Sequence, residues 1–445
     1  MENPQKERRQ GPKDMDKPVK LGLLGLGTVG AGVCRILQQN REVICKRAGT
    51  PFEIAKILVR DPEKQRGIEV DPRLLTTDAA DILEDPEIAV VIELMGGLEP
   101  AYQYIHTALD KGKHVVTANK AVIASHGARL IRLAASRGVD LYYEGSVAGG
   151  IPIIKPLRES LVGNRIEEIM GIVNGTTNYI LTRMTQEKAD FTDVLAEAQA
   201  LGYAEADPAA DIEGHDAAHK LVILASLAFQ TPISIHEVYC EGISKITAED
   251  IAFAEHFGYT IKLLAIAKRQ PKGIEARVHP TFVPNRHPLA AVHGVFNAIF
   301  LRGDAVGELM FYGRGAGDLP TGSAVIADIV DVLRNRKRGS HHRVETLWQS
   351  IPVEAMEDVR TRYYIRLHAV DRPGVLAQVA ANFGAEGVSI ESMIQQGRGQ
   401  DQPVPIVFIT HEVEERQMRA SLARIATLPS IKDIANVIRV EGGLR

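Results

Sequence analysis

The feature that most constrains the fold is a glycine pattern near the start of the chain. Gly25, Gly27 and Gly30 form G-x-G-x-x-G directly after the apolar run VKLGLLG and directly before a helix-length segment. The first glycine permits a tight turn, the second lets backbone approach a pyrophosphate, and the third lets helix and strand pack closely. The motif alone is weak, but strand, turn and helix in this order predict a dinucleotide site. The alternative is a glycine-rich turn in an unrelated α/β sheet.

The segments around this motif alternate between strand-like and helix-like patterns. A helix follows the glycines to about Gln39, and the apolar runs FEIAKILV, IAVVIELM, HVVTAN and VDLYYE are separated by helix-length stretches. This βαβ alternation is typical of a parallel sheet covered on both faces. It predicts an α/β Rossmann domain over residues 19–150, with part of 315–340 as a candidate to complete the sheet.

The remaining segments predict two further domains. Helical segments followed by β-rich runs indicate an α+β domain over 151–336, and a basic, weakly periodic stretch predicts a linker over 337–360. The order βαββαβ over 361–445 is that of a ferredoxin-like unit. Residues 1–18 mix charges and prolines with almost no apolar side chains and predict a disordered tail.

Composition narrows the class of partner. The chain of 445 residues has room for about three domains, and 52 basic against 56 acidic residues give a net charge of −4. This balance argues against nucleic acid or a membrane as the main partner and favours a small molecule. No apolar run approaches the ~20 residues of a membrane span. The three cysteines, without a C-x-x-C pair, fit a reducing compartment, so we expect a cytoplasmic protein.

Basic residues follow the second predicted strand, where NAD-binding proteins usually carry an acid. FEIAKILV runs into Arg60, with Lys64 and Arg66 shortly after. Cations there suit a 2′-phosphate, so NADP is favoured, whereas Asp61 leaves NAD use open. The alternative is that Arg60 only solvates the strand end.

Further polar and small residues lie where ligands bind in such folds. Asn119 and Lys120 follow the strand HVVTA, at the carboxyl edge of the sheet, although Lys120 also fits a solvated loop lysine. EGSVAGGIPI at 144–153, NGTTN at 174–178 and GRGAGDLPT at 313–321 are rich in small residues. These loops either line a ligand cleft or merely connect domains.

The segment GYAEADPAADIEGHDAAHK gathers carboxylates ahead of Lys220. Asp216 and Lys220 are i, i+4 on a predicted helix and share one face. Burial lowers the pKa of a lysine and neighbouring carboxylates raise it, so the two effects oppose each other here. The arrangement can hold an amino-group cation and pass a proton. The other acids are Glu205, Asp207, Asp211 and Glu213.

Two other interpretations of this segment are a divalent metal site and helix capping, with Asp207 before Pro208. A lysine inside the cluster weakens the metal interpretation, and capping explains only some of the acids. His215 and His219 form H-D-A-A-H, which is not the H-E-x-x-H of zinc proteases, so solvated helix histidines are favoured.

Taken together, these motifs resemble the homoserine dehydrogenase family over residues 19–336. GLGTVG, TANK, EGSVAGGIPI, NGTTNYIL, GYAEADPAADIEGHDAAHK and GRGAGDLPT follow one another as in that family. The terminal unit resembles an ACT domain, with DRPGVL at 371–376 opening its first helix. The resemblance implies NAD(P)-dependent, reversible reduction of L-aspartate 4-semialdehyde to L-homoserine, on the path to threonine, methionine and isoleucine. It also implies that 151–336 is the substrate-binding, catalytic and dimerisation domain.

The resemblance implies roles residue by residue. Lys220 or Lys120 would exchange the proton on the reacting oxygen, and the choice between them stays open. Glu205 would bind the substrate ammonium. The other implied substrate contacts are Asp211, Asp216, Thr176, Tyr203 and Gly175. The implied cofactor contacts are Gly25, Leu26, Gly27, Thr28, Val29, Gly30, Arg60, Lys120, Gly202, Gly315 and Gly317.

The resemblance also implies a structural monovalent cation, an effector and an oligomer. The cation, usually sodium, would be held largely by main-chain carbonyls at Glu144, Val147, Gly149 and Ile151. Threonine is the expected inhibitor, with Asp371 and Gly374 as candidate contacts at the strand-to-helix turn of the ACT domain. A homodimer or homotetramer is expected.

Two rival interpretations belong to other classes. Another Rossmann dehydrogenase, such as aspartate-semialdehyde dehydrogenase, needs a nucleophilic cysteine. Cys34 falls in the first helix, Cys45 just after it, and Cys240 in no recognisable nucleophile setting. A non-catalytic sensor of dinucleotide and amino acid would not need a proton-exchanging lysine such as Lys220 beside Glu205, so an enzyme is favoured.

Overall fold

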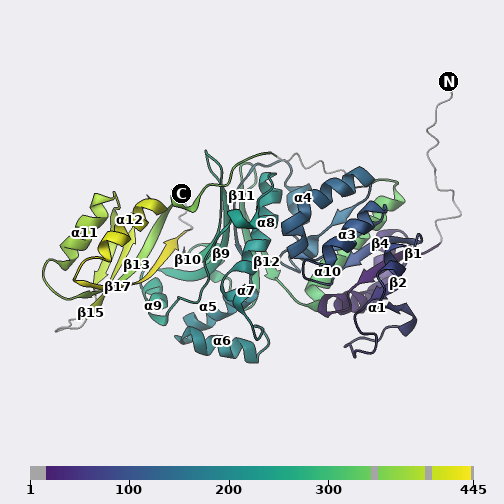
Figure 1. Ribbon diagram of the computed structural model, residues 1–445, viewed down its shortest axis with the longest axis horizontal. Helices are drawn as coiled ribbons and strands as arrows, with labels where there is room; N and C mark the ends of the chain where they lie inside the picture. The colour runs from purple at the N-terminus through teal and green to yellow at the C-terminus, as the bar shows by residue number, and fades with distance from the viewer. Residues whose placement is uncertain (1–16, 342–348, 396–402, 442–445) are drawn as a thin grey trace, which may run out of the picture. The chain divides into compact units, whose positions relative to one another are not determined.

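The computed structural model divides into two compact units, each built around its own sheet (Figure 1). Unit 1 comprises residues 1–154 and 316–346, and unit 2 comprises 155–315 and 347–445. Among the described residues, every helix is too short or too polar to cross a membrane. The described residues are 17–341, 349–395 and 403–441.

Parts of three predicted segments lie outside the described residues, among them 396–402 and 442–445 of the predicted ferredoxin-like unit, 361–445. Of the predicted tail, 1–18, only Lys17 and Pro18 are described, and of the predicted linker, 337–360, residues 342–348 are not.

Unit 1 contains a parallel sheet whose strands follow the order 3-2-1-4-5-6. The strands are near-continuous apolar runs because helices cover both faces of such a sheet. This confirms the predicted Rossmann fold. In sheet order the strands are β3 (Leu75–Thr76), β2 (Phe52–Leu58), β1 (Val19–Leu24), β4 (Ile88–Glu93), β5 (His114–Thr117) and β6 (Leu141–Tyr142).

The first helix of unit 1 is longer than the sequence suggested. It continues past Gln39 to Ala48 and ends at Gly49, which adopts the left-handed conformation with φ 72°. Cys45 therefore lies inside the helix. The helices of this unit are α1 (Thr28–Ala48), α2 (Ala80–Leu83), α3 (Ala101–Asp110), α4 (Lys120–Arg137) and α10 (Asp318–Lys337).

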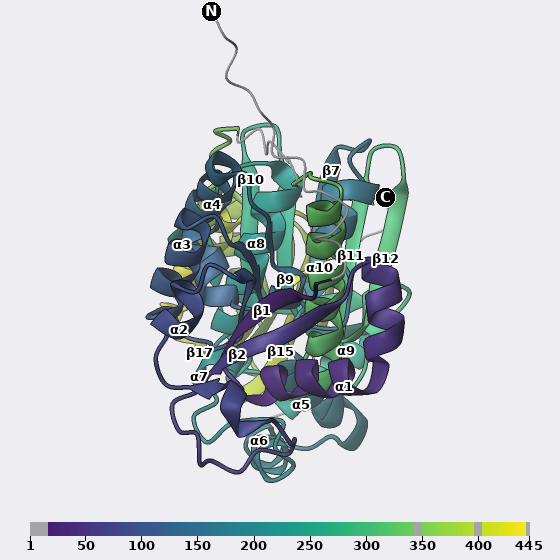
Figure 2. The ribbon, with the colours of Figure 1, turned by 90° about the vertical axis from the view of Figure 1, so that its right-hand side faces the viewer.

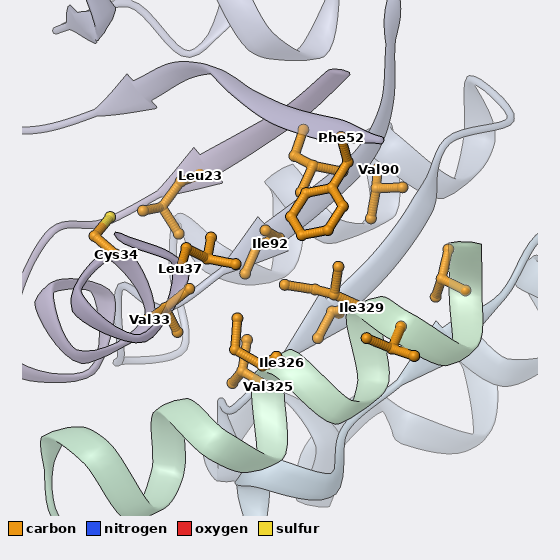
Figure 3. Packing of buried hydrophobic residues seen from close by; sticks show 14 of the residues in the cluster. Leu23, Val33, Cys34, Leu37, Phe52, Val90, Ile92, Val325, Ile326 and Ile329 are labelled. Carbon is orange, nitrogen blue, oxygen red and sulfur yellow. The ribbon is translucent and has the colours of Figure 1, made fainter. Parts of the chain in front are cut away.

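Residues 318–337 join unit 1 as helix α10, not as a strand, so this part of the predicted 315–340 covers the sheet instead of completing it. α10 packs against α1 (Figure 2). The backbones approach closely, because a Cβ at Gly32 would lie 2.2 Å from the main-chain oxygen of Asp318. Side chains of α10 such as Ile326 and Ile329 enter the same apolar core as Leu23, Val33 and Phe52 (Figure 3).

Unit 2 contains a mostly antiparallel sheet with helices, as the α+β prediction expected. One strand, β7, precedes the helical segments that the sequence placed first. In sheet order the strands are β12 (Gly307–Arg314), β11 (Phe296–Gly303), β7 (Ile166–Ile172), β9 (Tyr259–Arg269), β10 (Ile274–Pro284), β17 (Ile431–Val440), β13 (Arg360–Val370), β15 (Pro403–Thr410) and β14 (Ile390–Gln395). Off this path, β8 (Tyr239–Cys240) pairs with β10 and β16 (Val413–Glu414) with β13.

The C-terminal part of unit 2 has the predicted ferredoxin-like arrangement. Its strands follow the order β17-β13-β15-β14, and α11 (Val375–Ala385) and α12 (Glu415–Ile425) pack side by side against the sheet (Figure 1). The other helices of unit 2 are α5 (Gly175–Glu187), α6 (Phe191–Ala200), α7 (Ala209–Ile212), α8 (His215–Phe229) and α9 (Ala248–His256).

This terminal part shares one sheet with the rest of unit 2. β10 and β17 pair in parallel, with Thr281 opposite Arg439 and Phe282 opposite Val440. The described end of the predicted linker is also hydrogen-bonded to unit 2, since the Ile274 N–H donates to the Pro352 carbonyl at 2.9 Å. The terminal part is therefore an extension of the neighbouring sheet.

Candidate functional site

The glycine turn of unit 1 has the shape that a dinucleotide requires. Gly25 has φ 99°, and a Cβ there would lie 2.9 Å from the main-chain oxygen of Leu94. A Cβ on Gly30 would lie 2.4 Å from the oxygen of Gly25, whereas one on Gly27 would meet nothing within 4 Å. The turn is thus tight on one side and open on the other, and it leads into the N-terminus of α1, so its residues fit a pyrophosphate. Leu26, Thr28 and Val29 complete it.

Arg60 lies at the carboxyl edge of the same sheet, just beyond β2, with an exposed side chain. The loop after it is held by Arg66, which donates to the carbonyls of Asp61 at 2.6 Å and Lys64 at 2.8 Å. The Asp61 carboxylate accepts the N–H of Glu63 at 2.9 Å, so it stabilises its own turn.

Lys120 is the first residue of α4 and is half-buried. The preceding Asn119 caps the helix, because its Oδ1 accepts the N–H of Val122 at 3.2 Å. Sequence analysis missed the fully buried Glu93 of β4, whose carboxylate accepts the Thr117 hydroxyl at 2.6 Å beside this cap. The available signal was an acid closing an otherwise apolar strand, IAVVIE.

The acidic segment of unit 2 forms a buried polar cluster around Lys220. Its Nζ donates to Asp216 Oδ2 at 2.7 Å and to the carbonyl of Val173, just after β7, at 2.7 Å. The side chains of Lys220 and Asp216 are only 11% and 6% exposed. Asn174 links the cluster, donating to Asp211 Oδ1 at 2.7 Å and Asp216 Oδ2 at 2.8 Å.

This geometry suits proton exchange. Two of the three ammonium protons of Lys220 are donated to the partners named above, which fixes the direction of the third. Asn174 was not singled out in the sequence, although its motif NGTTN was. It caps α5 by accepting the Thr177 N–H at 2.9 Å, so a helix start and the cluster share one side chain.

Other predicted substrate residues lie around α5 and the turn after α6. The Thr176 hydroxyl donates to the carbonyl of Tyr203 at 2.7 Å, and the Tyr203 side chain is exposed. Gly175 starts α5, and Gly202 has φ 74°. Glu205 is exposed, and within the described residues no hydrogen bond joins its carboxylate to the Lys220 cluster.

Other residues of the acidic segment have local roles. Asp207 accepts the N–H of Ala209, the first residue of α7, at 3.2 Å, a local contact beside the helix start, whose N-cap position is Pro208. His219 contacts the carbonyl of His215 at 2.9 Å, within the helix.

The loop after β6 folds around one buried carboxylate. Glu144, in a short 3-10 turn (Glu144–Ser146), accepts the N–H groups of Ile153 at 2.5 Å and Ile154 at 2.8 Å. Gly149 has φ 44°, and Val147 and Ile151 are buried. No cluster of three or more His, Cys, Asp or Glu suited to a metal occurs in the described part of the chain, so a cation here would rely on main-chain carbonyls.

The glycines before α10 and α11 are conformationally constrained. A Cβ on Gly315 would lie 1.9 Å from Asn297 Nδ2, and Gly317 has φ 124°. Gly374, before α11, has φ 91°. The exposed Asp371 carboxylate near it accepts the side-chain amide of Gln395 at 3.2 Å.

Two of the three thiols, those of Cys34 and Cys240, are poor nucleophiles. Burial raises the pKa of Cys34 to about 11, and burial together with Glu213 and Glu241 raises that of Cys240 to about 11. Since the thiolate is the reactive form, dehydrogenase chemistry through either cysteine is disfavoured.

Comparison with known proteins covers both units. The model described as the homoserine dehydrogenase NAD-binding domain matches 25–144, that of homoserine dehydrogenase matches 152–330, and that of the ACT domain matches 363–430. Homoserine dehydrogenase of Synechocystis sp. is 48% identical over 434 residues, covering 95% of this chain and 99% of the relative.

Solved structures agree. A homoserine dehydrogenase from Thiobacillus denitrificans is 47% identical with a TM-score of 0.90, covering 96% of this chain and 98% of the other. A hyperthermophilic archaeal homoserine dehydrogenase in complex with NADPH is 27% identical with a TM-score of 0.60, covering 71% of this chain and 98% of the other.

Proposed function

This chain belongs to the homoserine dehydrogenase family, and we propose that Lys220 is the proton-transferring residue of its reaction. The enzyme is an oxidoreductase acting on a CH–OH group, and it interconverts L-aspartate 4-semialdehyde and L-homoserine with a nicotinamide dinucleotide. The observation that carries the proposal is the buried Lys220 ammonium, fixed by Asp216 and the Val173 carbonyl.

Reduction of the aldehyde leaves negative charge on its oxygen. The nicotinamide cofactor, when bound, supplies a hydride to the terminal carbon of the substrate. Lys220 donates a proton to the oxygen as the charge develops and takes it back in the reverse direction. Asp216 and Asn174 hold the ammonium in place and are positioning residues. Lys120, at the cofactor edge of unit 1, is the second candidate for the proton.

Substrate recognition falls to the surrounding polar residues. We propose that Glu205, exposed and outside the cluster's hydrogen bonds, binds the substrate ammonium, since a carboxylate at a site open to solvent suits an amine. Asp211 and Thr176 line the same pocket, together with Tyr203 and Gly175.

NADP is the cofactor that we propose. Arg60 stands exposed at the end of β2, where the adenine ribose is recognised in this fold, and the Asp61 carboxylate is engaged in its own turn. The archaeal relative was solved with NADPH, which supports the same assignment. The backbone of Gly202, Gly315 and Gly317 would approach cofactor or substrate.

We propose a structural sodium ion, a threonine effector and a cytoplasmic oligomer. The ion would lie in the loop of Glu144, Val147, Gly149 and Ile151, coordinated mainly by carbonyls. Threonine would bind the ACT turn at Asp371 and Gly374, directly before α11, because a helix N-terminus suits a carboxylate. The chain would act as a homodimer or homotetramer, and its free cysteines favour the cytoplasm.

The direct test is the loss of nicotinamide absorbance on adding aspartate 4-semialdehyde. The assay is run with NADPH and with NADH, with and without threonine. We expect turnover that is faster with NADPH and slowed by threonine. A folded protein that binds the dinucleotide but turns nothing over would point instead to a sensor.

A further inference from the structure

A fully buried carboxylate lies at the edge of the Rossmann sheet that receives the cofactor. Glu93, the last residue of β4, is 0% exposed and lies opposite Leu24 of β1, directly before the glycine turn. A buried charge is costly unless polar groups stabilise it, so its surroundings indicate what it does.

Donors from two loops converge on this carboxylate. Oε2 accepts the Thr117 hydroxyl at 2.6 Å, and Oε1 accepts the Met95 N–H at 2.8 Å and the Asn119 amide at 3.4 Å. Burial raises the pKa of Glu93, and these donors oppose that rise. Met95 belongs to the loop after β4, and Thr117 and Asn119 to the segment joining β5 to α4.

The same donors connect the two loops to each other. The Asn119 amide also donates to the Gly97 carbonyl at 2.8 Å, and the Asn119 N–H donates to the Thr117 hydroxyl at 3.0 Å. Gly96 and Gly97 are both left-handed, with φ 75° and 74°. The loop after β4 is therefore held in place by hydrogen bonds to the Glu93 carboxylate and to Asn119.

Asn119 also connects the Glu93 carboxylate to the start of helix α4. Its Oδ1 caps α4, whose first residue is Lys120. Glu93 holds the amide end of the side chain whose oxygen end fixes the first turn of this helix. The start of α4, and with it the backbone of Lys120, is thus linked to Glu93 through a single intermediate residue.

The strand order tells which half of the cofactor lies nearby. In the order 3-2-1-4-5-6 the two mononucleotide-binding halves meet between β1 and β4. The adenine half is recognised at β2, by Arg60 here, so the nicotinamide half falls on the side of β4 and β5. Glu93 and its partners lie on that side.

We propose that Glu93 is a positioning residue for hydride transfer: through Thr117 and Asn119 it holds the Gly96–Gly97 turn and Lys120 in place beside the nicotinamide. The proposal rests on the proposed function, because it assumes a dinucleotide reaction at this edge. Misplacement by about 1 Å can cost about 100-fold in rate, so loss of this anchor acts mainly on kcat.

Glu93→Gln keeps the size of the side chain and removes the charge. We expect kcat to fall by about 10–100-fold while KM for aspartate 4-semialdehyde changes by less than about twofold. Thr117→Val, which removes the shortest bond to the carboxylate, serves as a second variant if Glu93→Gln folds poorly. It should move kcat in the same direction.

Lys113→Met is the matched control. Lys113 is also buried against β4, but its Nζ donates to the Ile88 carbonyl at 2.8 Å, at the opposite end of that strand. Its loss should lower the melting temperature and leave kcat unchanged. A Glu93→Gln protein with lower melting temperature but wild-type kcat, like the control, would overturn the proposal.

A binding measurement separates this proposal from the proposed function. NADPH and the adenine fragment 2′,5′-ADP are titrated into wild-type and Glu93→Gln protein. We expect the variant to bind NADPH more weakly and the fragment equally well. Equal affinity for both in the two proteins would overturn the positioning role even if the wild-type enzyme did not turn over aspartate 4-semialdehyde.

Discussion

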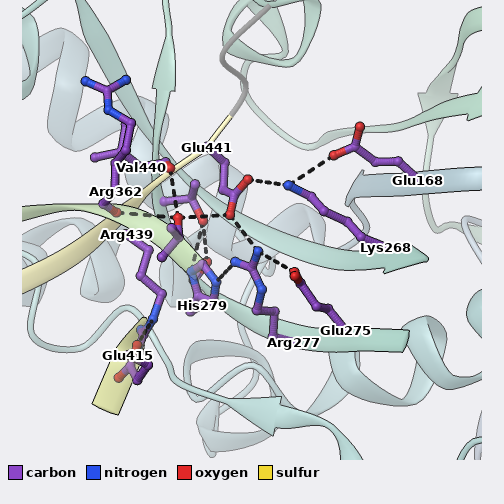
Figure 4. A network of polar contacts seen from close by, with 12 residues as sticks. Glu168, Lys268, Glu275, Arg277, His279, Arg362, Glu415, Arg439, Val440 and Glu441 are labelled. Atoms are coloured by element: carbon purple, nitrogen blue, oxygen red, sulfur yellow. Dashed lines mark hydrogen bonds and ion pairs between the residues drawn. The ribbon is translucent and has the colours of Figure 1, made fainter. Parts of the chain in front are cut away.

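Two lysines of unit 2 lie among carboxylates, the buried Lys220 and the partly buried Lys268, and they differ in how many carboxylates balance their charge. Lys220 has one carboxylate partner, Asp216, and a main-chain carbonyl. Lys268 lies between two carboxylates, with Nζ at 2.5 Å from Glu441 and 3.2 Å from Glu168 (Figure 4). Lys220 is thus balanced by one carboxylate and a neutral carbonyl, whereas Lys268 is balanced by two carboxylates that also pair with other cations.

The electrostatics of the second region confirm that it is a closed network. Burial opposes the charge of Lys268, but Glu441 and Glu168 outweigh it and raise its pKa. Burial likewise opposes the charge of Glu441, yet Arg277 and Lys268 hold its pKa well below the ordinary value. Glu441 and its partners Lys268 and Arg277 each favour the charged form of the other. A closed network of this kind suits structure, whereas the Lys220 cluster suits chemistry.

The network also explains how the ACT region is attached. Glu441 directly follows β17, and it contacts Arg277 of β10 at 2.6 Å and Lys268 of β9. Arg439 of β17 pairs with Glu415 of α12 at 2.7 Å. The ion pairs of Glu441 thus reinforce the junction of β10 with β17, whereas the Arg439–Glu415 pair ties β17 to α12 within the ACT region. Deleting the ACT region would remove β17 and expose the edge of β10.

The largest expected effect is on the turnover rate and concerns the Lys220 cluster. Lys220→Ala should lower kcat by about 10²–10⁴-fold, since it removes a positioned proton donor. Dinucleotide affinity, measured by NADPH fluorescence, should stay unchanged. His219→Ala, on the same helix, is the control and should keep its activity. Full turnover by Lys220→Ala would assign the proton to Lys120 instead.

Substitutions in the network of Glu441, Lys268 and Arg277 should lower the stability of the folded protein. Glu441→Gln leaves Arg277 and Lys268 short of a buried partner and should lower the free energy of unfolding by about 3–5 kcal/mol. Urea unfolding followed by circular dichroism measures it. Glu42→Gln breaks an exposed pair with Lys46 and should change stability by less than about 0.5 kcal/mol. Equal losses of stability in Glu441→Gln and Glu42→Gln would show that the buried network stabilises the protein no more than an exposed ion pair does.

The pH dependence of stability tests the role of Glu441 further. The pKa of Glu441 is lower folded than unfolded, so its contribution to stability is present above its unfolded pKa of about 4.3 and is lost as pH falls below it. One such group changes stability by at most about 1.4 kcal/mol per pH unit. Between about pH 5 and pH 3, wild type should therefore lose stability more steeply than Glu441→Gln. If stability fell equally with pH in wild type and in Glu441→Gln, the pKa of Glu441 would be the same in the folded and unfolded protein.

The smallest expected effect concerns the effector turn. Asp371→Ala in the full chain should raise the threonine concentration for half inhibition by about 10-fold, the loss of one charged hydrogen bond, and leave uninhibited kcat unchanged. A point variant is needed because removing 361–445 would strip β17 from β10. Unchanged inhibition would place the effector elsewhere.

Sequence reasoning succeeded where the chemistry is local. The glycine turn, the Asp216–Lys220 pair and the ferredoxin-like order each depend on spacing within a short segment. It failed where distant segments meet. Part of 315–340 was expected to complete the Rossmann sheet, but residues 318–337 form helix α10, which packs against α1 in unit 1.

Most of the site residues that sequence reasoning missed were missed for the same reason, because their partners are distant in the sequence. Glu93 contacts residues about one strand and helix away in sequence, and Lys268 and Glu441 meet only when β9 and β17 share a sheet. Asn174 was missed for a different reason: its motif NGTTN was noted as a whole, but the sequence does not show which of its side chains reaches Asp211 and Asp216.

The most direct test compares Lys220→Met with Lys268→Met in the same two measurements, kcat with aspartate 4-semialdehyde and melting temperature. The structure predicts that folded Lys220→Met loses turnover whatever its change in melting temperature, while Lys268→Met melts earlier and, when folded, turns over substrate like wild type. If Lys268→Met lost turnover without melting earlier, or Lys220→Met melted earlier without losing turnover, the distinction between a catalytic cluster and a structural network would be wrong.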